Sequence, residues 1–277
     1  MAGDLTGRKA LITGAAGGIG QAVARLLDGH GMQLILVDRD EASIRSASQA
    51  LLTPPEIMTC DLSDREDVER LCGSIRDNHP DLYALVNNAG IGLPGPVDAL
   101  DMDVIDAHLE INLRAPIRIM RAVAPLMTAR GNGAMVATVS LGGVLALKDS
   151  APYSASKFGL RGFLCGFHQE MYSKGVKVSG IYPAAVDTPM LHHEAMHGGS
   201  VLNFVDKVMT PEDVAQAILR GIHTGKLEIY VPYSASLTAR FVAAFPWMLR
   251  PLLPLLEKFG EAGRKKFVAR KGLDAGR

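Results

Sequence analysis

Short apolar runs alternate with segments of helical periodicity along most of this chain, and this alternation constrains its fold more than any other feature. We expect seven strands, at residues 9–13, 33–38, 56–61, 82–87, 135–140, 177–182 and 227–231. The segments between them repeat apolar residues at helical spacing, as at Val23, Leu26 and Leu27. Strands that alternate with helices form right-handed βαβ units, whose helices cover both faces of a parallel sheet. The sequence therefore predicts an α/β fold with a doubly wound parallel sheet.

Length, charge and cysteine content restrict the class of protein. The 277 residues contain no internal repeat and no low-complexity linker before Pro232, so we expect one domain over residues 1–233. A hydrophobic content of 48% and a formal net charge of zero argue against a disordered chain and against a nucleic-acid partner. Three cysteines without paired spacing, a charged N-terminus and no apolar run of membrane-spanning length predict a cytoplasmic protein.

A glycine-rich turn follows the first expected strand and opens a helix. It reads Thr13-Gly14-Ala15-Ala16-Gly17-Gly18-Ile19-Gly20. Glycines permit a tight turn and let a pyrophosphate approach backbone N–H groups at the positive end of the helix dipole. The spacing G-x-x-x-G-x-G differs from the common G-x-G-x-x-G, so a turn without a ligand remains an alternative. We expect a nucleotide to contact Gly14, Gly17, Gly18, Ile19 and Gly20.

Asp38 ends the second expected strand, 18 residues after Gly20. A carboxylate there accepts hydrogen bonds from the adenosine ribose hydroxyls and repels a 2′-phosphate, which favours NAD as the cofactor. Arg39 follows directly and offers a positive charge to the 2′-phosphate of NADP, so the sequence leaves NADP open. An ordinary turn residue at the end of a strand is the other interpretation of Asp38.

Tyr153 and Lys157 lie four residues apart, which places them on one face of a helix. A free phenol has a pKa near ~10 and is a poor base at neutral pH. A nearby ammonium and a positive nicotinamide ring would both favour the phenolate and lower that pKa. Tyr153 would then exchange a proton with an alcohol or a carbonyl while hydride moves, and Lys157 would also bind the nicotinamide ribose. The spacing alone is weak, because ordinary surface pairs share it.

Polar residues close two other expected strands at the same edge of the sheet. Ser140 ends one of them, where its hydroxyl would polarise a substrate carbonyl, and Asn87-Asn88-Ala89-Gly90 ends another. Open parallel sheets bind ligands at this carboxyl edge. Each segment by itself is also compatible with an ordinary turn at the end of a strand.

The motifs, taken in this order, resemble those of the short-chain dehydrogenase/reductase family. They are T-G-x-x-x-G-I-G at Thr13, N-N-A-G at Asn87, Ser140, and Y-x-A-S-K at Tyr153. The resemblance extends from about Leu5 to Pro232 and implies a Rossmann-like fold over most of the chain. It also implies an oxidoreductase that moves a hydride between NAD(H) and an alcohol/ketone pair.

The resemblance assigns roles to further residues. It implies a catalytic triad of Ser140, Tyr153 and Lys157, with Asn112 bracing a water-linked proton relay to Lys157. Cofactor contacts are implied at Asp61, Leu62, Asn88, Ala89, Gly90, Pro183, Val186 and Thr188. Members commonly form homodimers or homotetramers through the helices near Asn112 and Tyr153. One departure is Ala184, where the family usually has glycine; it would narrow the nicotinamide pocket or require a different backbone.

Two other functions fit parts of the same sequence. His193-Glu194-Ala195-Met196-His197 matches the H-E-x-x-H motif of zinc hydrolases. Such a site needs a sustained helix, a third ligand and an open position for water, and Gly198-Gly199 would end the helix at once. A nucleotide-sensing binding module of the same fold is the non-enzymatic alternative. The three triad residues argue against it, because a sensor needs no acid–base.

The segment between Thr188 and Thr210 corresponds to a mobile substrate lid in the family. It carries the apolar residues Met190, Leu191, Met196, Val201, Leu202 and Phe204. Met and Leu form adaptable apolar walls, so we expect a lipophilic alcohol or ketone, such as a steroid, a retinoid or a long-chain compound. The alternative is that these residues only pack the lid on the core.

The sequence changes character after the dinucleotide-binding and catalytic domain of residues 1–233. Large apolar residues crowd between Phe241 and Phe259, interrupted by Pro246, Pro251 and Pro254. From Arg250 to the end, eight basic and three acidic residues give a net charge of +5. We expect residues 234–277 to form an extension that caps the substrate pocket or a subunit interface, lies on an anionic membrane surface, or frays. Its arginines and prolines argue against a spanning helix.

Overall fold

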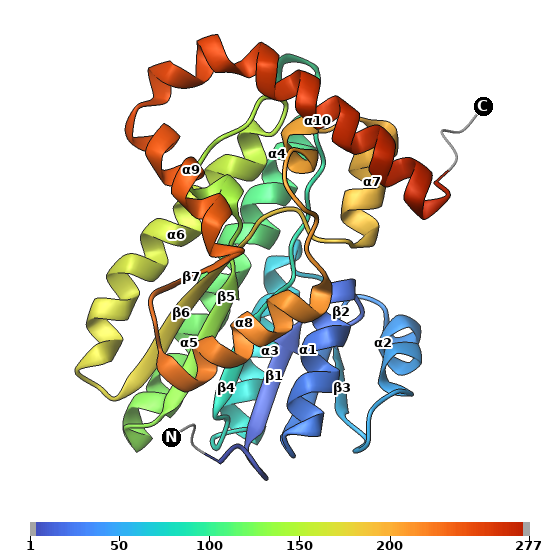
Figure 1. Ribbon diagram of the computed structural model, residues 1–277. Coiled ribbons are helices and arrows are strands. Elements are labelled where there is room, and N and C mark those ends of the chain that lie inside the picture. Colours follow the sequence, from blue (N-terminus) through green and yellow to red (C-terminus); the bar gives the residue numbers. More distant parts are fainter. Residues whose placement is uncertain (1–3, 274–277) are drawn as a thin grey trace.

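A seven-stranded parallel sheet forms the centre of the protein (Figure 1). The computed structural model describes residues 4–273. The strands are β1 (Lys9–Thr13), β2 (Gln33–Asp38), β3 (Glu56–Thr59), β4 (Ala84–Asn87), β5 (Gly133–Thr138), β6 (Val176–Pro183) and β7 (Glu228–Val231). They lie in the order β3-β2-β1-β4-β5-β6-β7, and every pairing is parallel. The predicted doubly wound sheet is confirmed, and each strand ends within two residues of its expected position.

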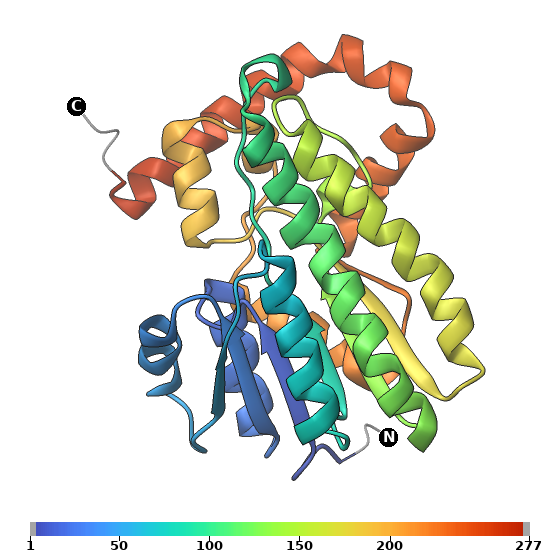
Figure 2. The ribbon, with the colours of Figure 1, turned by 180° about the vertical axis from the view of Figure 1, so that it is seen from behind.

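Helices cover both faces of the sheet. One core receives buried apolar side chains from α1 (Gly18–Gly29), α2 (Glu41–Ser48) and α8 (Pro211–Thr224). The other receives them from α3 (Arg65–Asn78), α5 (Ala115–Arg130) and α6 (Ala151–Tyr172), which face the viewer in Figure 2. Successive side chains of a strand point to opposite faces, so Leu11 belongs to one core and Ile12 to the other. A strand buried on both faces needs a continuous apolar run, and β1 has one.

The start of α8 shows how local sequence sets the helix ends. Thr210 Oγ1 accepts a hydrogen bond from Asp213 N at 3.2 Å, and Asp213 Oδ2 accepts one from Thr210 N at 2.9 Å. This capping box satisfies two backbone donors, and Pro211 occupies the first helical position, where no donor is needed. Gly225, with φ of +62°, ends the helix in the left-handed conformation.

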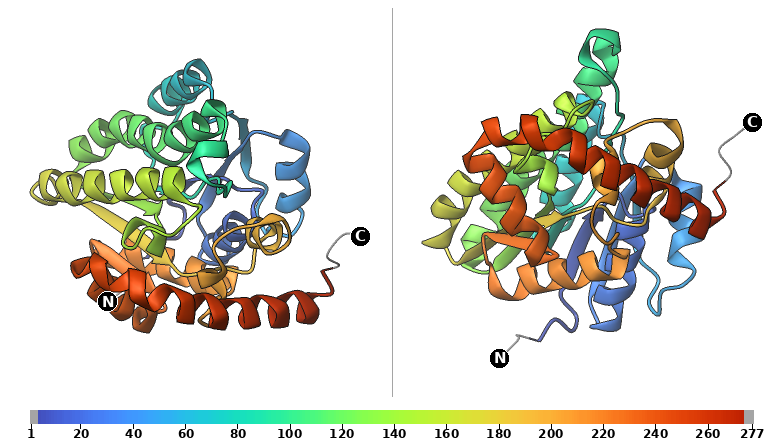
Figure 3. Two further views of the ribbon diagram at one scale, coloured as in Figure 1. Left: turned by 90° about the horizontal axis from the view of Figure 1, so that it is seen from above. Right: turned by 45° about the horizontal axis from the view of Figure 1, so that its top comes forward.

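The connections at the carboxyl edge of the sheet carry several helices. η1 (Val97–Ala99), α4 (Met102–Leu109) and the π-helical η2 (Glu110–Arg114) lie between β4 and α5, and η3 (Leu141–Gly143) follows β5. α7 (Pro189–His197) and η4 (Val201–Phe204) lie between β6 and α8; we call residues 189–209 the lid segment. α9 (Tyr233–Ala244), η5 (Pro246–Met248) and α10 (Leu249–Lys271) follow β7. Figure 3 shows α10 running across the lid segment.

α10 packs on the lid segment through two glycines and one phenylalanine. A Cβ at Gly260 would lie 2.3 Å from the Val201 carbonyl oxygen, and one at Gly263 would lie 2.0 Å from that of Phe204. Phe267 is buried against the lid residues Leu191, Ala195 and Phe204. The end of α10 also reaches back to the loop after β6, where Lys271 forms an ion pair with Asp187. Within residues 4–273, no helix is both long and apolar enough to cross a membrane.

Candidate active site

The glycine-rich turn packs so closely on the end of β4 that Gly14 has no room for a side chain. Its φ is +65°, and a Cβ there would lie 2.7 Å from Ala89 Cα. A Cβ at Gly20 would lie 2.0 Å from the Gly14 carbonyl oxygen. Asn88 Nδ2 donates a hydrogen bond to that same oxygen at 3.2 Å. The turn and residues 88–90 therefore form one closely packed unit at the carboxyl edge.

The N-terminus of α1 is suited to an anion. Gly17 is the N-cap, no side chain among the described residues caps the helix, and its first turn contains no acidic residue. The N–H groups of a first turn have no partner inside the helix, and the helix dipole places positive charge there. A Cβ at Gly18 would lie 3.3 Å from Thr188 Cγ2, so the loop after β6 borders this helix end. These residues fit a pyrophosphate.

Asp38 lies at the end of β2, beside the glycine-rich turn. Its Oδ2 accepts a hydrogen bond from Ala16 N at 3.0 Å, and its Oδ1 accepts one from Arg39 N at 2.8 Å. Backbone donors thus fix the carboxylate at the edge of the turn, while the Arg39 side chain is exposed. Each carboxylate oxygen can accept a further hydrogen bond.

Asp61 and Leu62, two of the cofactor contacts that the resemblance implies, differ in the atoms that they expose. Asp61 is exposed, and its carboxylate accepts hydrogen bonds from Ser63 Oγ and Ser63 N at 2.7 and 2.8 Å, which lower the pKa of Asp61. Leu62 buries its side chain in the core that contains α3. Of the two side chains, only that of Asp61 presents polar atoms to the surface.

Ser140 and Tyr153 come together at the carboxyl edge. Ser140 lies two residues beyond the end of β5, where we expected it to close the strand, and its Oγ accepts a hydrogen bond from Gly142 N at 2.9 Å. Tyr153 lies in the first turn of α6. A Cβ at Gly142 would lie 3.3 Å from Ser140 Oγ and 2.9 Å from Tyr153 Cε1. Glycine at this position therefore lets both side chains approach the same point.

Burial dominates the acid–base behaviour of Tyr153 and Lys157. It raises the pKa of Tyr153 to about 12, although a hydrogen bond with Ser140 acts to lower that pKa. Burial also lowers the pKa of Lys157 to about 8. Lys157 Nζ donates to the Thr138 carbonyl oxygen at 2.9 Å and lies 5.8 Å from the centroid of the Tyr153 ring. The predicted lowering of the Tyr153 pKa is not found in the protein by itself, because desolvation of the phenol outweighs the hydrogen bond with Ser140.

Asn112 is fully buried in the π-helical turn η2. Its Oδ1 accepts a hydrogen bond from Ile91 N at 2.8 Å, and its Nδ2 donates to the Ile91 carbonyl oxygen at 2.9 Å and to Ser156 Oγ at 3.1 Å. It therefore ties the loop after β4 to α6. A Cβ at Gly90 would lie 3.1 Å from Asn112 Oδ1 and 3.4 Å from Lys157 Nζ, so Gly90 sits against both side chains.

The loop after β6 accommodates alanine where the family usually has glycine. Ala184 N donates a hydrogen bond to the Val231 carbonyl oxygen at 2.8 Å, and Ala184 does not have a positive φ. Pro183 is the last residue of β6, and Val186 is buried. Thr188 Oγ1 donates to the Val186 carbonyl oxygen at 3.2 Å. Ala184 therefore needs no strained backbone.

The H-E-x-x-H motif lies on α7, which ends at His197, just before the two glycines. His193 and His197 are exposed and stack with ring centroids 4.4 Å apart. Glu194 does not join them, because its Oε2 accepts a hydrogen bond from Asn203 Nδ2 at 2.8 Å. Over residues 4–273, no group of three or more His, Cys, Asp or Glu side chains is placed to hold a metal ion. The geometry gives no support to a zinc hydrolase.

Glu194 is a site residue that sequence reasoning missed. Its charge raises the pKa of Tyr153, and a Cβ at Gly92 would lie 3.2 Å from Glu194 Oε1. Burial raises the pKa of Glu194 itself to about 7, although the hydrogen bond with Asn203 acts to lower it. Buried His108 is a second missed neighbour, with its ring centroid 6.4 Å from that of Tyr153. The sequence marked Glu194 only as part of the H-E-x-x-H motif, and it gave no signal for His108.

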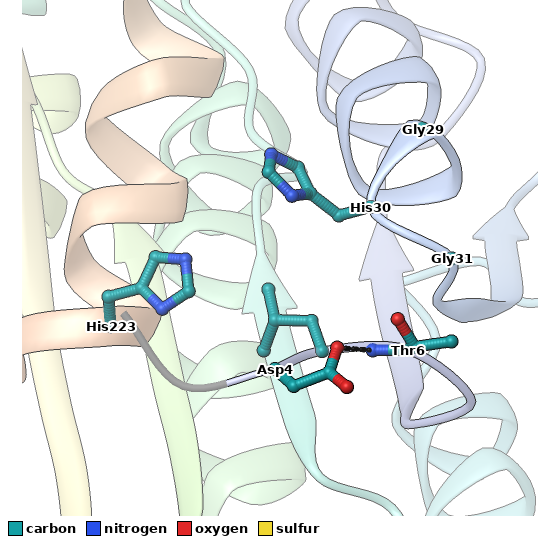
Figure 4. A pocket seen from close by; sticks show the side chains of 7 residues that line it. Asp4, Thr6, Gly29, His30, Gly31 and His223 are labelled. Atoms are coloured by element: carbon teal, nitrogen blue, oxygen red, sulfur yellow. Dashed lines mark hydrogen bonds between the residues drawn. The ribbon is translucent and has the colours of Figure 1, made fainter. Parts of the chain in front are cut away.

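A separate open pocket lies at the opposite edge of the sheet (Figure 4). It has a volume of about 520 Å³ and is lined by Asp4, Leu5, Thr6, Gly29, His30, Gly31 and His223. These residues precede β1, β2 and β7 in the chain, so the pocket lies at the amino edge. It includes none of the predicted site residues.

Comparison with known proteins matches the same part of the chain. A family model described as short chain dehydrogenase matches residues 8–197. An uncharacterized oxidoreductase of Staphylococcus epidermidis is 28% identical over 181 residues, which cover 65% of this chain and 79% of that protein. An uncharacterized oxidoreductase of Staphylococcus aureus is 28% identical over 217 residues, which cover 78% of this chain and 90% of that protein.

Solved structures agree with the family match. A short-chain dehydrogenase/reductase family protein has 28% identity and a TM-score of 0.73, over 83% of this chain and 97% of its own. A metagenomic short-chain oxidoreductase in complex with NADP has 29% identity and a TM-score of 0.70, over 83% and 98%. Levodione reductase, at 23% identity and a TM-score of 0.73 over 82% and 96%, shares the fold. The chain belongs to the short-chain dehydrogenase/reductase family of oxidoreductases.

Proposed function

We propose that the protein transfers a hydride between NAD(H) and a lipophilic alcohol/ketone pair, with Tyr153 as the acid–base. The observation that carries this proposal is the position of Ser140, Tyr153 and Lys157. They gather at the carboxyl edge of the sheet, where Gly90 of the loop after β4 lies against Lys157. Acid–base groups and the phosphate-binding turn thus border one region, as hydride transfer requires.

The bound cofactor would accept or donate the hydride at its nicotinamide ring. The chain has residues placed to bind each part of this cofactor. The open N-terminus of α1 would hold the pyrophosphate through backbone N–H groups of residues 18–20. Residues 61–62 would contact the adenine, and residues 88–90 would contact the cofactor along the loop after β4. Lys157 would donate hydrogen bonds to the nicotinamide ribose, and residues 183–188 would contact the carboxamide.

Tyr153 would carry the proton of the reaction. In reduction the Tyr153 hydroxyl would give its proton to the carbonyl oxygen while hydride reaches the carbonyl carbon. In oxidation Tyr153 would first lose its own proton, and the phenolate would then take the hydroxyl proton while the carbon-bound hydrogen leaves as hydride. Ser140 would donate a hydrogen bond to the substrate oxygen. With a pKa raised to about 12, Tyr153 is neutral at pH 7 and ready to donate a proton to a ketone. In the oxidation direction, Lys157 and the proton relay that Asn112 braces would help to remove the proton from the Tyr153 hydroxyl.

Asp38 is the basis for proposing NAD over NADP. A hydrogen bond from Ala16 N fixes its carboxylate beside the turn. There the carboxylate would accept hydrogen bonds from the adenosine ribose hydroxyls of NAD and would repel the 2′-phosphate of NADP. The metagenomic relative was solved with NADP, and Arg39 is exposed next to Asp38, so NADP is the competing choice.

The proposal of a lipophilic substrate rests on Met190 of the lid segment. A Cβ at Gly92 would lie 3.2 Å from Met190 Sδ, so this flexible thioether borders the loop after β4, beside Glu194. Leu191 and Phe204 are already buried against α10 and serve packing instead. We also propose a homodimer or homotetramer formed through α5 and α6, where Phe158 is exposed.

Replacing Tyr153 by phenylalanine tests the proposal. We expect the turnover number to fall by about 10²-fold or more, because the acid–base is lost, while the affinity for NADH stays unchanged. Absorbance of reduced nicotinamide with a panel of lipophilic alcohols and ketones measures turnover, and NADH fluorescence measures binding. Retained turnover would place the acid–base elsewhere. A wild-type protein that binds NADH but converts no member of the panel would instead be a nucleotide sensor.

A further inference from the structure

Half of the exposed large apolar side chains lie in one short stretch near the end of the chain. Sixteen such side chains are exposed among the described residues, and eight of them fall within residues 233–259. We call these eight the C-terminal apolar face: Tyr233, Leu237, Phe241, Phe245, Trp247, Leu252, Leu255 and Phe259. A concentration of this kind on a protein surface marks a site of contact with another protein or with a membrane.

The first part of this face is an aromatic ridge on α9. Tyr233, Leu237 and Phe241 are spaced four residues apart and so share one side of the helix, while Ser236, Ala239 and Val242 are buried on the other. The ridge continues past the end of the helix. Phe241 and Phe245 have ring centroids 5.4 Å apart, and Phe245 and Trp247 have theirs 6.4 Å apart. Trp247 is 72% exposed.

The second part lies on the outer side of α10. Leu252, Leu255 and Phe259 follow the i, i+3, i+7 spacing of one helix face. The inner side contains Gly260, Gly263 and Phe267, which already pack on the lid segment. At about 3.6 residues per turn the two sets lie side by side and form one wide apolar face. Within residues 4–273 only the part with Gly260, Gly263 and Phe267 is covered. Figure 3 shows α10 lying along the outside of the molecule.

Positive charge accompanies the apolar face. The outer side of α10 continues from Phe259 to exposed Lys266, and exposed Lys258 and Lys265 flank it. Residues 233–273 contain eight basic and two acidic residues, a net charge of +6, although the whole chain has a net charge of zero. The remainder of the protein is correspondingly acidic. Residues 233–273 therefore carry an excess of positive charge that the rest of the chain balances.

We propose that the C-terminal apolar face docks on the surface of an anionic lipid bilayer. Helices that lie in a bilayer interface combine aromatic and leucine side chains on one face with lysines at its border. α10 has this combination, and α9 extends the apolar part of the face. Lysines near the surface are attracted by anionic headgroups. A second copy of this chain fits the face less well, because a two-fold contact would bring two positive faces together. The proposal does not depend on the reaction that the protein catalyses.

Trp247 makes the proposal directly measurable, because it is the one tryptophan of the chain. We expect its fluorescence emission to shift to shorter wavelength when vesicles of equimolar phosphatidylcholine and phosphatidylglycerol are added. Vesicles of phosphatidylcholine alone should produce a much smaller shift at the same lipid concentration. Co-sedimentation of the full chain with each kind of vesicle gives the partition coefficient without relying on the tryptophan.

Matched variants separate the two parts of the face. Phe241→Ser together with Phe259→Ser should reduce the partition coefficient roughly tenfold or more, whereas Leu52→Ser, at an 82% exposed position between α2 and β3, should leave it unchanged. Lys258→Gln with Lys266→Gln should reduce it on anionic vesicles by about 30-fold. The control for charge is Lys174→Gln with Lys226→Gln, both exposed at the amino edge.

Three results would overturn the proposal. The first is an unshifted Trp247 emission with all protein left in the supernatant of both vesicle types. The second is equal partition into anionic and neutral vesicles, which would remove the role of the lysines. The third is an emission shift that grows with protein concentration in the absence of lipid and accompanies dimer formation in sedimentation velocity. That last result would assign the face to a second copy of the chain.

Discussion

Replacing Glu194 by glutamine should stabilise the protein at pH 8 but not at pH 5. Burial raises the pKa of Glu194 from its ordinary value of 4.5 to about 7. In the unfolded chain this carboxyl group ionises near its ordinary pKa, so between the two values the unfolded state releases a proton that the folded state keeps. The folded protein therefore loses stability as the pH rises through this window. With ~1.4 kcal/mol for each pKa unit, the shift from 4.5 to about 7 corresponds to a loss of about 3 kcal/mol above pH 7.

The assay is urea unfolding of wild type and Glu194→Gln at pH 5 and pH 8. The glutamine side chain keeps an oxygen that accepts the hydrogen bond from Asn203, so the free energies of unfolding should agree within about 1 kcal/mol at pH 5. At pH 8 the variant should be more stable by about 2–3 kcal/mol. Glu170→Gln, at an exposed position on α6, is the matched control. Its free energy of unfolding should differ from that of wild type by the same amount at both pH values.

A stability difference between Glu194→Gln and wild type that is the same at both pH values would refute this reasoning. It would mean that the carboxyl group ionises alike in the folded and unfolded states. The lid segment would then leave Glu194 more open to water than the burial of its side chain indicates.

Three further substitutions test other parts of the structure. Asp38→Ala should shift the ratio of dissociation constants towards NADP by roughly tenfold, measured by titrating both cofactors, because a like charge near the 2′-phosphate is removed. Gly14→Ala should lower the free energy of unfolding by about 2 kcal/mol more than Gly131→Ala, since both have a positive φ but only a Cβ at Gly14 meets backbone, at 2.7 Å. Phe267→Ala should cost about 3 kcal/mol and speed amide exchange in residues 189–209, because it uncouples α10 from the lid segment.

The sheet was predictable from the sequence because parallel strands buried on both faces require uninterrupted apolar runs. β1 and β2 begin and end at the expected residues. Ser140 was misplaced by two positions, since β5 ends at Thr138 and the chain then turns into η3. Apolar periodicity does not distinguish the last residue of a strand from the first residues of the turn that follows.

The extension shows where proline is a poor guide to helix boundaries. Pro251 and Pro254 interrupt the apolar sequence, yet α10 continues through both to Lys271. Pro251 lies in the first turn, where a missing N–H removes no helical bond. Packing of the inner side of α10 on the lid segment holds the rest of the helix together.

The acid–base groups were predictable as residue types but not in their charge states. The sequence places Tyr153 and Lys157 on one helix face, because residues four positions apart lie on the same side of any helix. This spacing does not say how deeply the two side chains are buried. Desolvation depends on which elements cover the two side chains, and the lid residue Glu194, 41 positions after Tyr153, is one of the groups that act on the phenol. A long-range contact of this kind has no signature in a single sequence.

The position of α10 has a consequence for how the protein matures in the cell. All seven strands precede residues 249–271 in the chain, so the sheet can form while these residues are still being synthesised. Until then Leu191 and Phe204 lack the phenylalanine that covers them. A nascent chain that stalls before α10 would expose this apolar surface to chaperones and proteases. α10 can therefore cover the lid segment only after all seven strands of the sheet have been synthesised.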